Sequence, residues 1–391
     1  MSEAIIVGGG IGGLSTAAAL ARVGFECQIF EQSEALREVG AGLTIWGNAM
    51  RVLRQFGLEE NLLRLGSRLD VMEVRILEGR ILSKADFALL SKKLGVPVPF
   101  VVHRADLLRE LARLTNSTQV HCSYRCVRLV EGADGVTASF AEKGDLHGDL
   151  VVGADGLHST VRRHLHGDVR PRFAGYTCWR AVIPFESEVL HKSGFETWGA
   201  GARFAALPCG PGRVCWWATR NAKEGERDAP YGRKAAVQEI FQQWHSPIPE
   251  LIAATARECI LRNDIADRLP STEWGKGRVT LLGDAAHPTT PNLGQGACQA
   301  MEDALVLADC LRHIPGVEPA LREYERRRFR RTAAITNQSW RFGRICQWEL
   351  PAGCWMRNLA TRCTPSWISQ RLIQSIMAYE PPVLPPASLC V

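Results

Sequence analysis

The feature that most constrains the fold is a run of six residues, GGGIGG at positions 8–13, of which five are glycines. Apolar residues 4–7 come directly before it and predict a short buried strand. Small and apolar residues 14–23 follow it and predict a helix, and residues 26–30 predict a second strand that ends in Glu31. The chain therefore begins with a strand–loop–helix–strand unit, which is typical of α/β folds with a parallel sheet.

The glycines of this loop have the spacing G-x-G-x-x-G, and each has a physical role in such a unit. Gly8 allows a tight turn, Gly10 lets the backbone approach a pyrophosphate, and Gly13 lets the helix pack closely on the strand. Glu31 lies eighteen residues beyond Gly13, where an acid accepts hydrogen bonds from a ribose. The combination predicts a Rossmann-like unit that binds a dinucleotide. A glycine-rich turn with an incidental glutamate is the alternative.

A second strand–turn–helix unit is expected near the middle of the chain. Residues 149–156, DLVVGADG, read as a strand that enters a tight turn containing Asp155. Ser159 and Arg162 lie on the helix that is expected to follow. Open α/β sheets bind ligands at the ends of their strands, so Asp155 is a candidate site residue.

A third unit of this kind occupies residues 278–303. Its strand, at 279–282, runs into Asp284, and a loop rich in Pro, Thr and Gly leads to a helix that starts near Ala297. The N-terminus of a helix leaves backbone N–H groups free to meet negative charge. This corner is therefore expected to contact an anionic or electron-rich ligand through Asp284 and the start of the helix.

Length and composition limit the class of protein. With 391 residues the chain exceeds one ordinary domain, so two are expected. The net charge of +6, from 47 basic and 41 acidic residues, is too small an excess to predict nucleic-acid binding. The sequence contains no uninterrupted apolar run of roughly 18 residues, so no membrane span is predicted. Thirteen cysteines without C-x-x-C spacing are interpreted as reduced thiols of a cytoplasmic protein without a metal site.

The three units together resemble the three motifs of the class A flavoprotein monooxygenases, the p-hydroxybenzoate hydroxylase-like enzymes. The matching residues are 8–13 with Glu31, 153–156 with Ser159 and Arg162, and 283–288, and the framework spans residues 4–335. The resemblance implies FAD, rather than NAD, at the N-terminal site. It also implies that the Asp155 motif serves both FAD and NAD(P)H, without a separate nicotinamide domain.

The implied fold is α/β with an α+β second layer. A Rossmann-like FAD-binding domain is expected to carry an inserted, mostly antiparallel β-sheet substrate domain and C-terminal helices. The strand-like, aromatic-rich texture of residues 174–274 agrees with such a sheet. The predicted division is an FAD-binding domain at 1–70, 100–173 and 275–340, a substrate domain at 71–99 and 174–274, helices at 341–379, and a disordered tail at 380–391.

Family positions imply a set of cofactor contacts in this sequence. The AMP half and the pyrophosphate of FAD would be contacted by Gly12, Glu31, Gln32 and Thr44. Arg104, in an R-x-x-L helix, would touch FAD, Val127 would contact the adenine through its backbone, and Asp284 would bind the ribityl chain. The pyrimidine edge of the flavin would be surrounded by Gly294, Gln295, Gly296 and Ala297.

The chemistry implied by the resemblance depends on the cofactor. NAD(P)H reduces FAD, oxygen adds to flavin C4a, and the hydroperoxide delivers OH to a small aromatic, heteroaromatic or isoprenoid substrate by hydroxylation or epoxidation. Pro291 and Gly294 would lie near the peroxide, and no further catalytic side chain is required. Two alternatives remain open: a flavin-dependent reductase of isoprenoid double bonds, and a non-catalytic flavin- or ligand-binding protein. A monomer or homodimer is expected.

Arg203 is the candidate substrate contact. Alternation in a strand places Arg203, Ala205 and Leu207 on one face, and two small or apolar neighbours around a cation suit the floor of a pocket. The segment resembles a strand of the FAD-dependent urate hydroxylases in which an arginine contacts the substrate. Those enzymes carry a tyrosine on the next strand, where this chain has Cys215, so urate itself is doubtful. A surface position on the strand is the alternative.

Several other residues admit two interpretations. Trp179, Trp198, Trp216 and Trp217 line either an apolar pocket or the core. Asn48 is expected to cap the N-terminus of a helix. The arginine-rich run at 326–331 is interpreted as a solvated helix face, and His287 as a structural histidine of the turn.

Overall fold

The computed structural model describes residues 2–36, 41–115, 120–228 and 232–386. Its first layer is a five-stranded sheet, and all of its strand pairs are parallel. In spatial order the strands are β18 (Val279–Leu281), β12 (Leu150–Gly153), β1 (Ser2–Val7), β2 (Phe25–Phe30) and β8 (Val120–His121). Strands such as β1 and β12 are buried on both faces, which is why they read as continuous apolar runs.

The two faces of this sheet are covered differently. A Cβ on Gly13 would lie 3.3 Å from Ile6 Cγ2, so the helix α1 (Ile11–Ala21) packs on one face. On the other face a Cβ on Gly148 would lie 3.0 Å from Ile5, because a three-stranded antiparallel sheet packs there. That sheet consists of β11 (Gly144–Gly148), β10 (Val136–Phe140) and β9 (Cys126–Glu131). The preceding strand β8 belongs to the parallel sheet and not to this one.

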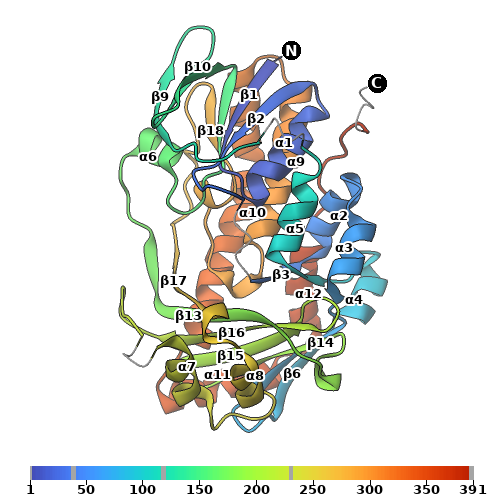
Figure 1. Cartoon of the computed structure of the whole chain (residues 1–391). Helices are drawn as coiled ribbons and strands as arrows, with labels where there is room; N and C mark the ends of the chain where they lie inside the picture. Colours follow the sequence, from blue (N-terminus) through green and yellow to red (C-terminus); the bar gives the residue numbers. More distant parts are fainter. Residues whose placement is uncertain (1, 37–40, 116–119, 229–231, 387–391) are drawn as a thin grey trace.

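The second layer is a seven-stranded sheet drawn at the bottom of Figure 1. Its order is β17 (Leu261–Asp267), β13 (Arg172–Pro184), β16 (Arg213–Asn221), β15 (Ala202–Pro208), β14 (Ser193–Trp198), β5 (Val71–Ile76) and β6 (Ile81–Asp86). Its strand pairs are antiparallel except for β14 with β5. The helices α7 (Arg233–Phe241) and α8 (Ile248–Ala254) pack on one face, against a core that contains Trp179 and Trp216.

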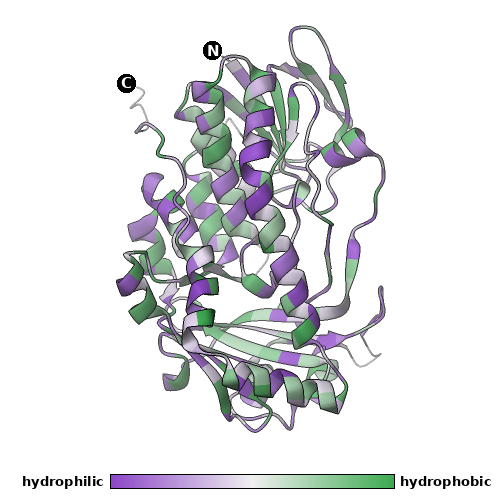
Figure 2. Cartoon of the chain, turned by 180° about the vertical axis from the view of Figure 1, so that it is seen from behind, coloured by the Kyte–Doolittle hydropathy of each residue, from purple (hydrophilic) through white to green (hydrophobic). Residues whose placement is uncertain are grey.

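Helices and a small sheet connect the layers. The small sheet consists of β3 (Gly42–Ile45), β7 (Phe100–His103) and β4 (Ser67–Arg68). The remaining helices are α2 (Gly47–Gln55), α3 (Glu59–Leu65), α4 (Phe87–Leu94), α5 (Arg104–Ala112), α6 (Thr160–His166), α9 (Gly296–His313), α10 (Val317–Cys346), α11 (Pro351–Cys363) and α12 (Ser366–Met377). The long α10 runs from the parallel sheet toward the seven-stranded sheet, and α11 and α12 follow it on the side seen in Figure 2.

The predicted fold class is confirmed: the protein is α/β, with a Rossmann-like parallel sheet, an antiparallel second layer and C-terminal helices. The division into domains stays a prediction, although the two large sheets draw their strands from the segments assigned to each, apart from Arg172 and Phe173 at the start of β13. In the segment expected to be a disordered tail, residues 380–386 pack against α2: Gln55 bonds to Pro382 O at 3.0 Å, and Leu384 is buried. Residues 387–391 of that tail lie outside the described part of the chain.

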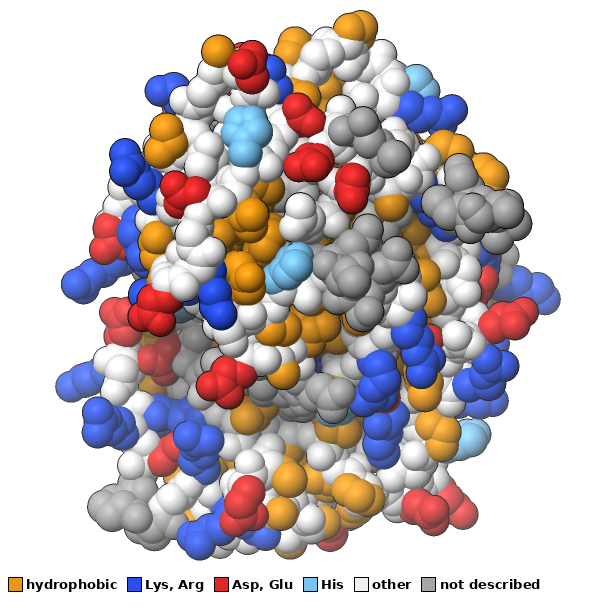
Figure 3. Space-filling model, turned by 45° about the horizontal axis from the view of Figure 1, so that its top comes forward, with side chains coloured by type: hydrophobic (Ala, Val, Ile, Leu, Met, Phe, Trp, Pro, Cys, Tyr) orange, Lys and Arg blue, Asp and Glu red, His pale blue; other side chains and the backbone are white. Residues whose placement is uncertain are grey.

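The surface carries both signs of charge. On the face shown in Figure 3, Lys/Arg and Asp/Glu side chains are intermixed, as a net charge of only +6 leads one to expect. Within the described residues, no helix is both long and apolar enough to cross a membrane. The same residues contain no group of three or more His, Cys, Asp or Glu side chains arranged to hold a metal ion.

Candidate active site

Three strands of the parallel sheet end side by side, and each carries one of the predicted motifs. The N–H of Ala154 donates to Val7 O at 2.8 Å, and the N–H of Leu282 donates to Gly153 O at 2.9 Å. These bonds bring the ends of β1, β12 and β18 into one row. Arg162, on α6, reaches across and donates from Nη1 to the carbonyls of Ala285 at 3.1 Å and Ala286 at 3.2 Å. The second motif thus holds the turn of the third.

The glycine-rich loop shows why its glycines are spaced as they are. Gly8 has a φ of +111°, and a Cβ there would lie 2.5 Å from Ala154 O. A Cβ on Gly13 would lie 1.9 Å from Gly8 O, so only glycine lets the helix approach the strand this closely. No described atom lies within 4 Å of the Cβ position of Gly10. That open side is where a pyrophosphate would approach the backbone.

A cavity of about 210 Å³ opens at this loop. Glu31 lies on its wall, where its Oε2 accepts from the N–H of Gly9 at 2.9 Å and its Oε1 accepts from the N–H of Ser33 at 2.9 Å. Those two bonds fix the carboxylate and leave it lone pairs for further donors. Predicted cofactor residues on the wall are Gly8, Gly10, Glu31, Gln32, Arg104 and Asp155. Val127 has an exposed side chain and follows Cys126, which also lines the cavity.

The carboxylate of Asp155 is already engaged within the protein. Its Oδ1 accepts from Ser159 Oγ at 2.5 Å, and its Oδ2 accepts from the N–H groups of Thr160 at 2.7 Å and Val161 at 3.2 Å. Burial raises the pKa of Asp155, while these hydrogen bonds act in the opposite direction. The side chain therefore stabilises the start of α6, and its predicted contact with FAD and NAD(P)H stays a prediction.

Two arginines in this region, one from each of two different elements, form no ion pair with a described residue. Arg104 is the first residue of α5, and Arg180 lies on β13 in the seven-stranded sheet. Among the described residues neither guanidinium forms an ion pair, and Arg180 Nε is buried without a hydrogen-bond partner. Burial and the nearby charge of Arg180 lower the pKa of Arg104, against the opposite effect of Asp284 and Glu31. Arg104 lines the cavity and Arg180 adds positive charge nearby, which suits an anionic ligand. Arg180 was not singled out from the sequence, because nothing in a strand pattern places it near Arg104.

The third motif forms a compact turn that ends at the N-terminus of α9. Gly294 has a φ of +61° after the turn Pro291–Leu293, and Gln295 precedes the helix. A Cβ on Gly296 would lie 3.5 Å from Asp284 Oδ1, so Asp284 faces the start of the helix. The Asp284 side chain is accessible to solvent, yet the surrounding protein partly desolvates its carboxyl group and raises the pKa of that group. The first turn of α9 contains no acid, which favours negative charge on a ligand there.

Thr44 and Trp46 lie beside this turn. Thr44 Cβ would be 3.7 Å from a Cβ on Gly294, and its carbonyl accepts from Cys298 Sγ at 3.6 Å. The structure thus places Thr44 at the start of α9, away from the residues that line the Glu31 cavity, where the AMP half was expected. Trp46 Nε1 would be 3.2 Å from a Cβ on Gly294 and is buried without a hydrogen-bond partner in the described residues.

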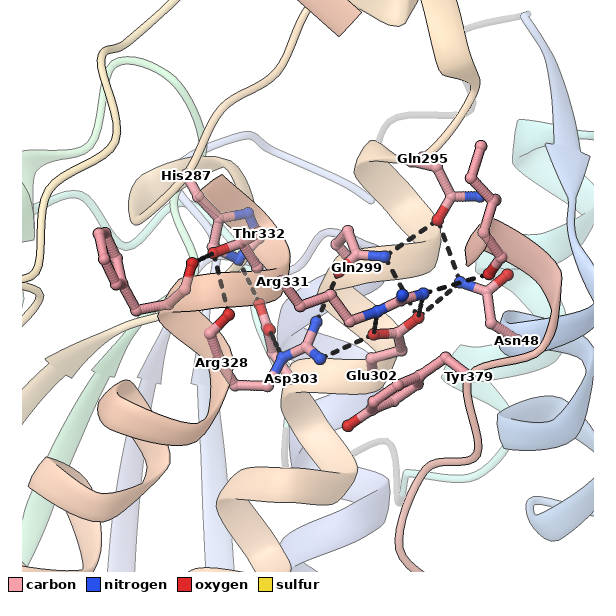
Figure 4. A network of polar contacts seen from close by, with 12 residues as sticks. Asn48, His287, Gln295, Gln299, Glu302, Asp303, Arg328, Arg331, Thr332 and Tyr379 are labelled. Carbon is pink, nitrogen blue, oxygen red and sulfur yellow. Dashed lines mark hydrogen bonds and ion pairs between the residues drawn. The ribbon is translucent and has the colours of Figure 1, made fainter. Parts of the chain in front are cut away.

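Below the turn, a buried polar network fixes the first part of α9 (Figure 4). Asn48 donates to Gln295 Oε1 at 3.0 Å and to Glu302 Oε1 at 2.5 Å, and Gln299 donates to the same two oxygens. Arg331 donates to both oxygens of Glu302 at 2.8 Å. The prediction that Asn48 caps its own helix is wrong, because α2 begins at Gly47 and the Asn48 side chain reaches α9 instead.

The other half of the network surrounds Asp303. His287 Nε2 lies 2.6 Å from Asp303 Oδ2, and Arg328 Nε donates to Asp303 Oδ1 at 2.6 Å. Burial alone would raise the pKa of Asp303, but His287 and Arg328 outweigh it and lower the pKa to about 2. The arginine-rich run is solvated at Arg326, as interpreted, whereas Arg328 is only 1 % exposed and holds α9 to α10. Within this pattern His287 is structural.

Arg203 ties the second layer to the turn of the third motif. Its Nη2 donates to Asn292 Oδ1 at 2.8 Å, its Nη1 to Glu196 Oε1 at 2.9 Å, and its Nε to Gln347 Oε1 at 2.7 Å. Asn292 also bonds to Tyr176 Oη at 3.0 Å. Arg203 is 3 % exposed, so its guanidinium is held by protein groups from three elements. Asn292 is a functional candidate that the sequence analysis missed, since a loop asparagine carries no local signal of its partner on a distant strand.

The face of the second layer that carries Arg203 is otherwise largely apolar. Leu207 and Cys215 are buried there, with Val182, Trp217 and Trp46 packed against them. A Cβ on Gly42 would lie 2.2 Å from Cys215 Sγ, so this face touches β3 directly.

The four tryptophans of this layer lie in different places. Trp179 and Trp216 belong to the core on the opposite face, Trp198 is buried beside Phe342, and Trp217 faces the inner side.

These features together define a flavin-dependent monooxygenase of class A: a parallel sheet with a glycine-rich loop, a helix N-terminus beside it, and a covering antiparallel sheet. The chain belongs to the FAD-binding domain family, whose model matches residues 1–339. It is an FAD-dependent oxidoreductase that uses NAD(P)H as co-substrate and a small molecule as substrate, as the sequence analysis predicted. The open side of Gly10, the arginines Arg104 and Arg180 without ion pairs in the described residues, and the unpaired Trp46 Nε1 fit FAD.

Relatives of known activity cover nearly the whole chain. It is 39% identical to the aurachin C monooxygenase/isomerase of Stigmatella aurantiaca, over 93% of this chain and 94% of that protein. It is 32% identical to the 2-heptyl-3-hydroxy-4(1H)-quinolone synthase of Pseudomonas aeruginosa, over 95% and 97%. Among solved structures, Klebsiella pneumoniae HpxO with FAD and uric acid superposes with a TM-score of 0.90 at 30% identity, over 96% of this chain and 97% of that one.

Proposed function

We propose that the enzyme hydroxylates a flat heteroaromatic ring that carries an apolar substituent, of the alkylquinolone type. The observation that carries this proposal is the state of Arg203. Its charge is neutralised by Glu196 at 2.9 Å, and its nitrogens donate to Asn292 and Gln347. A carboxylate or urate anion would have to displace those partners, whereas the surrounding Leu207, Cys215 and Trp217 suit an uncharged, apolar ring system.

The relatives support the same class. The Pseudomonas aeruginosa protein is named for a heptyl-substituted hydroxyquinolone, and its match extends over 95% of this chain. The aurachin C monooxygenase/isomerase shows the highest identity among the relatives described above, at 39%. HpxO shares the fold closely, but this chain has Cys215 at the strand position where the sequence resemblance expects a tyrosine in urate hydroxylases.

In this proposal the cofactor spans the two parts of the site. The cavity between Gly8 and Glu31 would hold the ADP portion of FAD, and the turn between Asp284 and α9 would hold the flavin. FAD, reduced by NAD(P)H, supplies oxygen activation and transfer. The N–H groups of Gly296 and Ala297 stabilise negative charge on the reduced ring, and the Asn48 network keeps those N–H groups in place. The seven-stranded sheet covers the turn, orients the substrate and excludes water.

Pro291 and Gly294 are proposed to lie at the oxygen-transfer position, because both belong to the turn that precedes α9. We also propose that the enzyme acts in the cytoplasm as a monomer or homodimer. All twelve cysteines in the described part of the chain are free thiols, which suits a reducing compartment.

The test is oxygen uptake by the purified, FAD-loaded enzyme with NADH or NADPH. Four substrates should be compared: a 2-alkyl-4-quinolone, urate, 3-amino-4-hydroxybenzoate and a terpenoid. The proposal expects quinolone-dependent oxygen uptake with a hydroxylated product that carries one added oxygen atom. Coupled turnover of urate or the aminohydroxybenzoate alone would overturn the substrate class. NAD(P)H oxidation without oxygen uptake would indicate a reductase instead.

A further inference from the structure

The C-terminal segment carries an unusual share of the exposed apolar side chains. Of the 20 large hydrophobic residues that are exposed in the described chain, nine lie between residues 345 and 372. All three exposed tryptophans are among them: Trp348 at 38%, Trp355 at 66% and Trp367 at 62%. Single exposed apolar residues need no explanation, but a contiguous group on one surface marks an interaction site.

The helices α11 and α12 present these residues outward. On α11, Trp355, Met356 and Leu359 are exposed, while Arg357 on the opposite face is buried and donates to the carbonyl of Cys346 at 2.8 Å. The helix is therefore fixed with its apolar side facing solvent. Both helices lie on the side of the molecule that faces the viewer in Figure 2.

The second helix repeats this arrangement. On α12, Trp367, Ile368 and Leu372 are exposed at the spacing of one helical face. Met377 is buried, and Ile373 packs against the apolar cluster that contains Trp46, Leu207 and Cys215. One face of α12 thus meets the inside of the protein, and the other is left bare. We call the exposed residues of 345–372 the C-terminal apolar surface.

The charges around this surface are mostly positive, with one exposed acid, Glu349, between Trp348 and Leu350. No Asp or Glu occurs between Glu349 and Glu380. Four exposed arginines lie around the apolar residues, and none forms an ion pair with a described residue: Arg341, Arg344, Arg362 and Arg371. Elsewhere on α10 the exposed Arg326 is paired with Glu323 at 2.6 Å, whereas the exposed Arg330 forms no ion pair with a described residue.

We propose that the C-terminal apolar surface binds the surface of an anionic phospholipid bilayer. Amphipathic helices with Trp and Leu on one side and arginines around them lie in the headgroup region, and tryptophan favours that interface. Each arginine near anionic headgroups adds electrostatic attraction. The bare side of α12 would then face the lipid, with its inner residue Ile373 adjoining the apolar side of the substrate layer.

A second copy of the chain fits this surface less well. A two-fold contact places the same patch on both partners, so the four arginines of each copy would lie in one interface. The segment between Glu349 and Glu380 offers no acid to neutralise them. A bilayer rich in anionic headgroups supplies both the apolar interior and the opposite charge.

Sedimentation with vesicles tests this proposal on the FAD-loaded full chain. The enzyme should pellet with vesicles of phosphatidylcholine mixed with phosphatidylglycerol, less with phosphatidylcholine alone, and less as salt is raised. Trp355→Ser with Trp367→Ser should lower the partition coefficient roughly tenfold or more, because each removes a deep apolar contact. Arg362→Glu with Arg371→Glu should abolish the preference for the anionic lipid.

Matched controls lie on a different surface. Leu269→Ser and Arg170→Glu alter an exposed leucine and an exposed arginine outside this segment and should leave vesicle binding unchanged. FAD content and the circular dichroism spectrum establish that each variant is folded. The proposal is overturned if the wild-type enzyme stays in solution with anionic vesicles, or if both double variants bind as it does. It is also overturned if the tryptophan variants convert a dimer into a monomer without affecting vesicle binding.

Discussion

At the scale of single residues, Arg203 and Asn292 show how a side chain acts through a neighbour. Burial alone would lower the pKa of Arg203, but the charge of Glu196 together with smaller effects of Cys346, Tyr176 and Cys178 raises it, so the guanidinium stays charged. One of its nitrogens holds Asn292 at 2.8 Å, and Asn292 belongs to the turn that leads to α9. We therefore propose that Arg203 acts as a positioning residue for the turn beside the proposed flavin site.

A double-mutant cycle tests this role. Arg203→Ala and Asn292→Ala should each raise KM or uncouple NADH oxidation from product formation, with FAD content unchanged. If Arg203 acts through Asn292, the double variant should be no worse than the more severe single one. Additive losses would show that Arg203 contacts the substrate independently. Arg203→Lys keeps a charge for Glu196 but loses the fork, so it should fold normally and still be uncoupled.

Asp284 gives a second test at this scale, on cofactor binding. The side chain makes no hydrogen bond or ion pair with the described residues, so Asp284→Ala leaves no partner unsatisfied and should fold. If it binds the ribityl chain, FAD affinity should fall by about 1–3 kcal/mol through loss of a charge-assisted hydrogen bond. Fluorescence titration of the apoprotein with FAD measures this. Asp134→Ala, in an exposed turn, is the control, and equal affinity in both variants would place the flavin elsewhere.

At the scale of elements, the pairing of α9 with α10 is ionic as well as apolar. Glu302 and Asp303 on α9 face Arg328 and Arg331 on α10, with ion pairs at 2.6–2.8 Å. Buried charges are tolerated only when they are paired, and removal of one partner leaves another uncompensated. The network therefore sets the position of α9, whose N-terminus forms part of the site.

Asp303→Asn should lower the free energy of unfolding by roughly 2–4 kcal/mol near neutral pH, measured by urea denaturation of the FAD-loaded enzyme. The folded pKa of Asp303, about 2, lies below its ordinary 3.8, so its contribution is fully present above that ordinary value. This contribution is lost as pH falls through the folded pKa. The difference in the free energy of unfolding between wild type and variant should therefore decrease in that pH range. Glu323→Gln, on the exposed side of α10, should unfold like wild type. A gap that does not change with pH would argue against the role of this ionisation.

At the scale of the whole molecule, the site exists because two layers meet. Cys215 of the seven-stranded sheet packs against Gly42, and Asn292 bonds to both Arg203 and Tyr176 of that sheet. The parallel sheet supplies the loops that suit a dinucleotide, while the antiparallel sheet supplies an apolar cover. Neither layer contains the complete site.

Local sequence patterns were sufficient to predict the first layer. Glycine spacing, the acid at Glu31 and the strand-end Asp155 and Asp284 are local patterns, because turns, helix starts and phosphate contacts depend on residues close together in the chain. Those patterns predicted a Rossmann-like unit that binds a dinucleotide, and the resemblance to the class A flavoprotein monooxygenases implied FAD and the class of enzyme. The alternation around Arg203 likewise placed it on the inner face of its strand.

The protein partners of these side chains could be identified only from the folded structure. Arg203, predicted as a substrate contact, meets Gln347 from 144 residues away, and Asn48 leaves its own helix for Glu302, 254 residues away. Arg328 is buried, although its arginine-rich surroundings read as a solvated face. Partners at such separations leave no periodic trace in a sequence, because the geometry that pairs them arises when packed elements exclude water and force each buried charge to find its opposite.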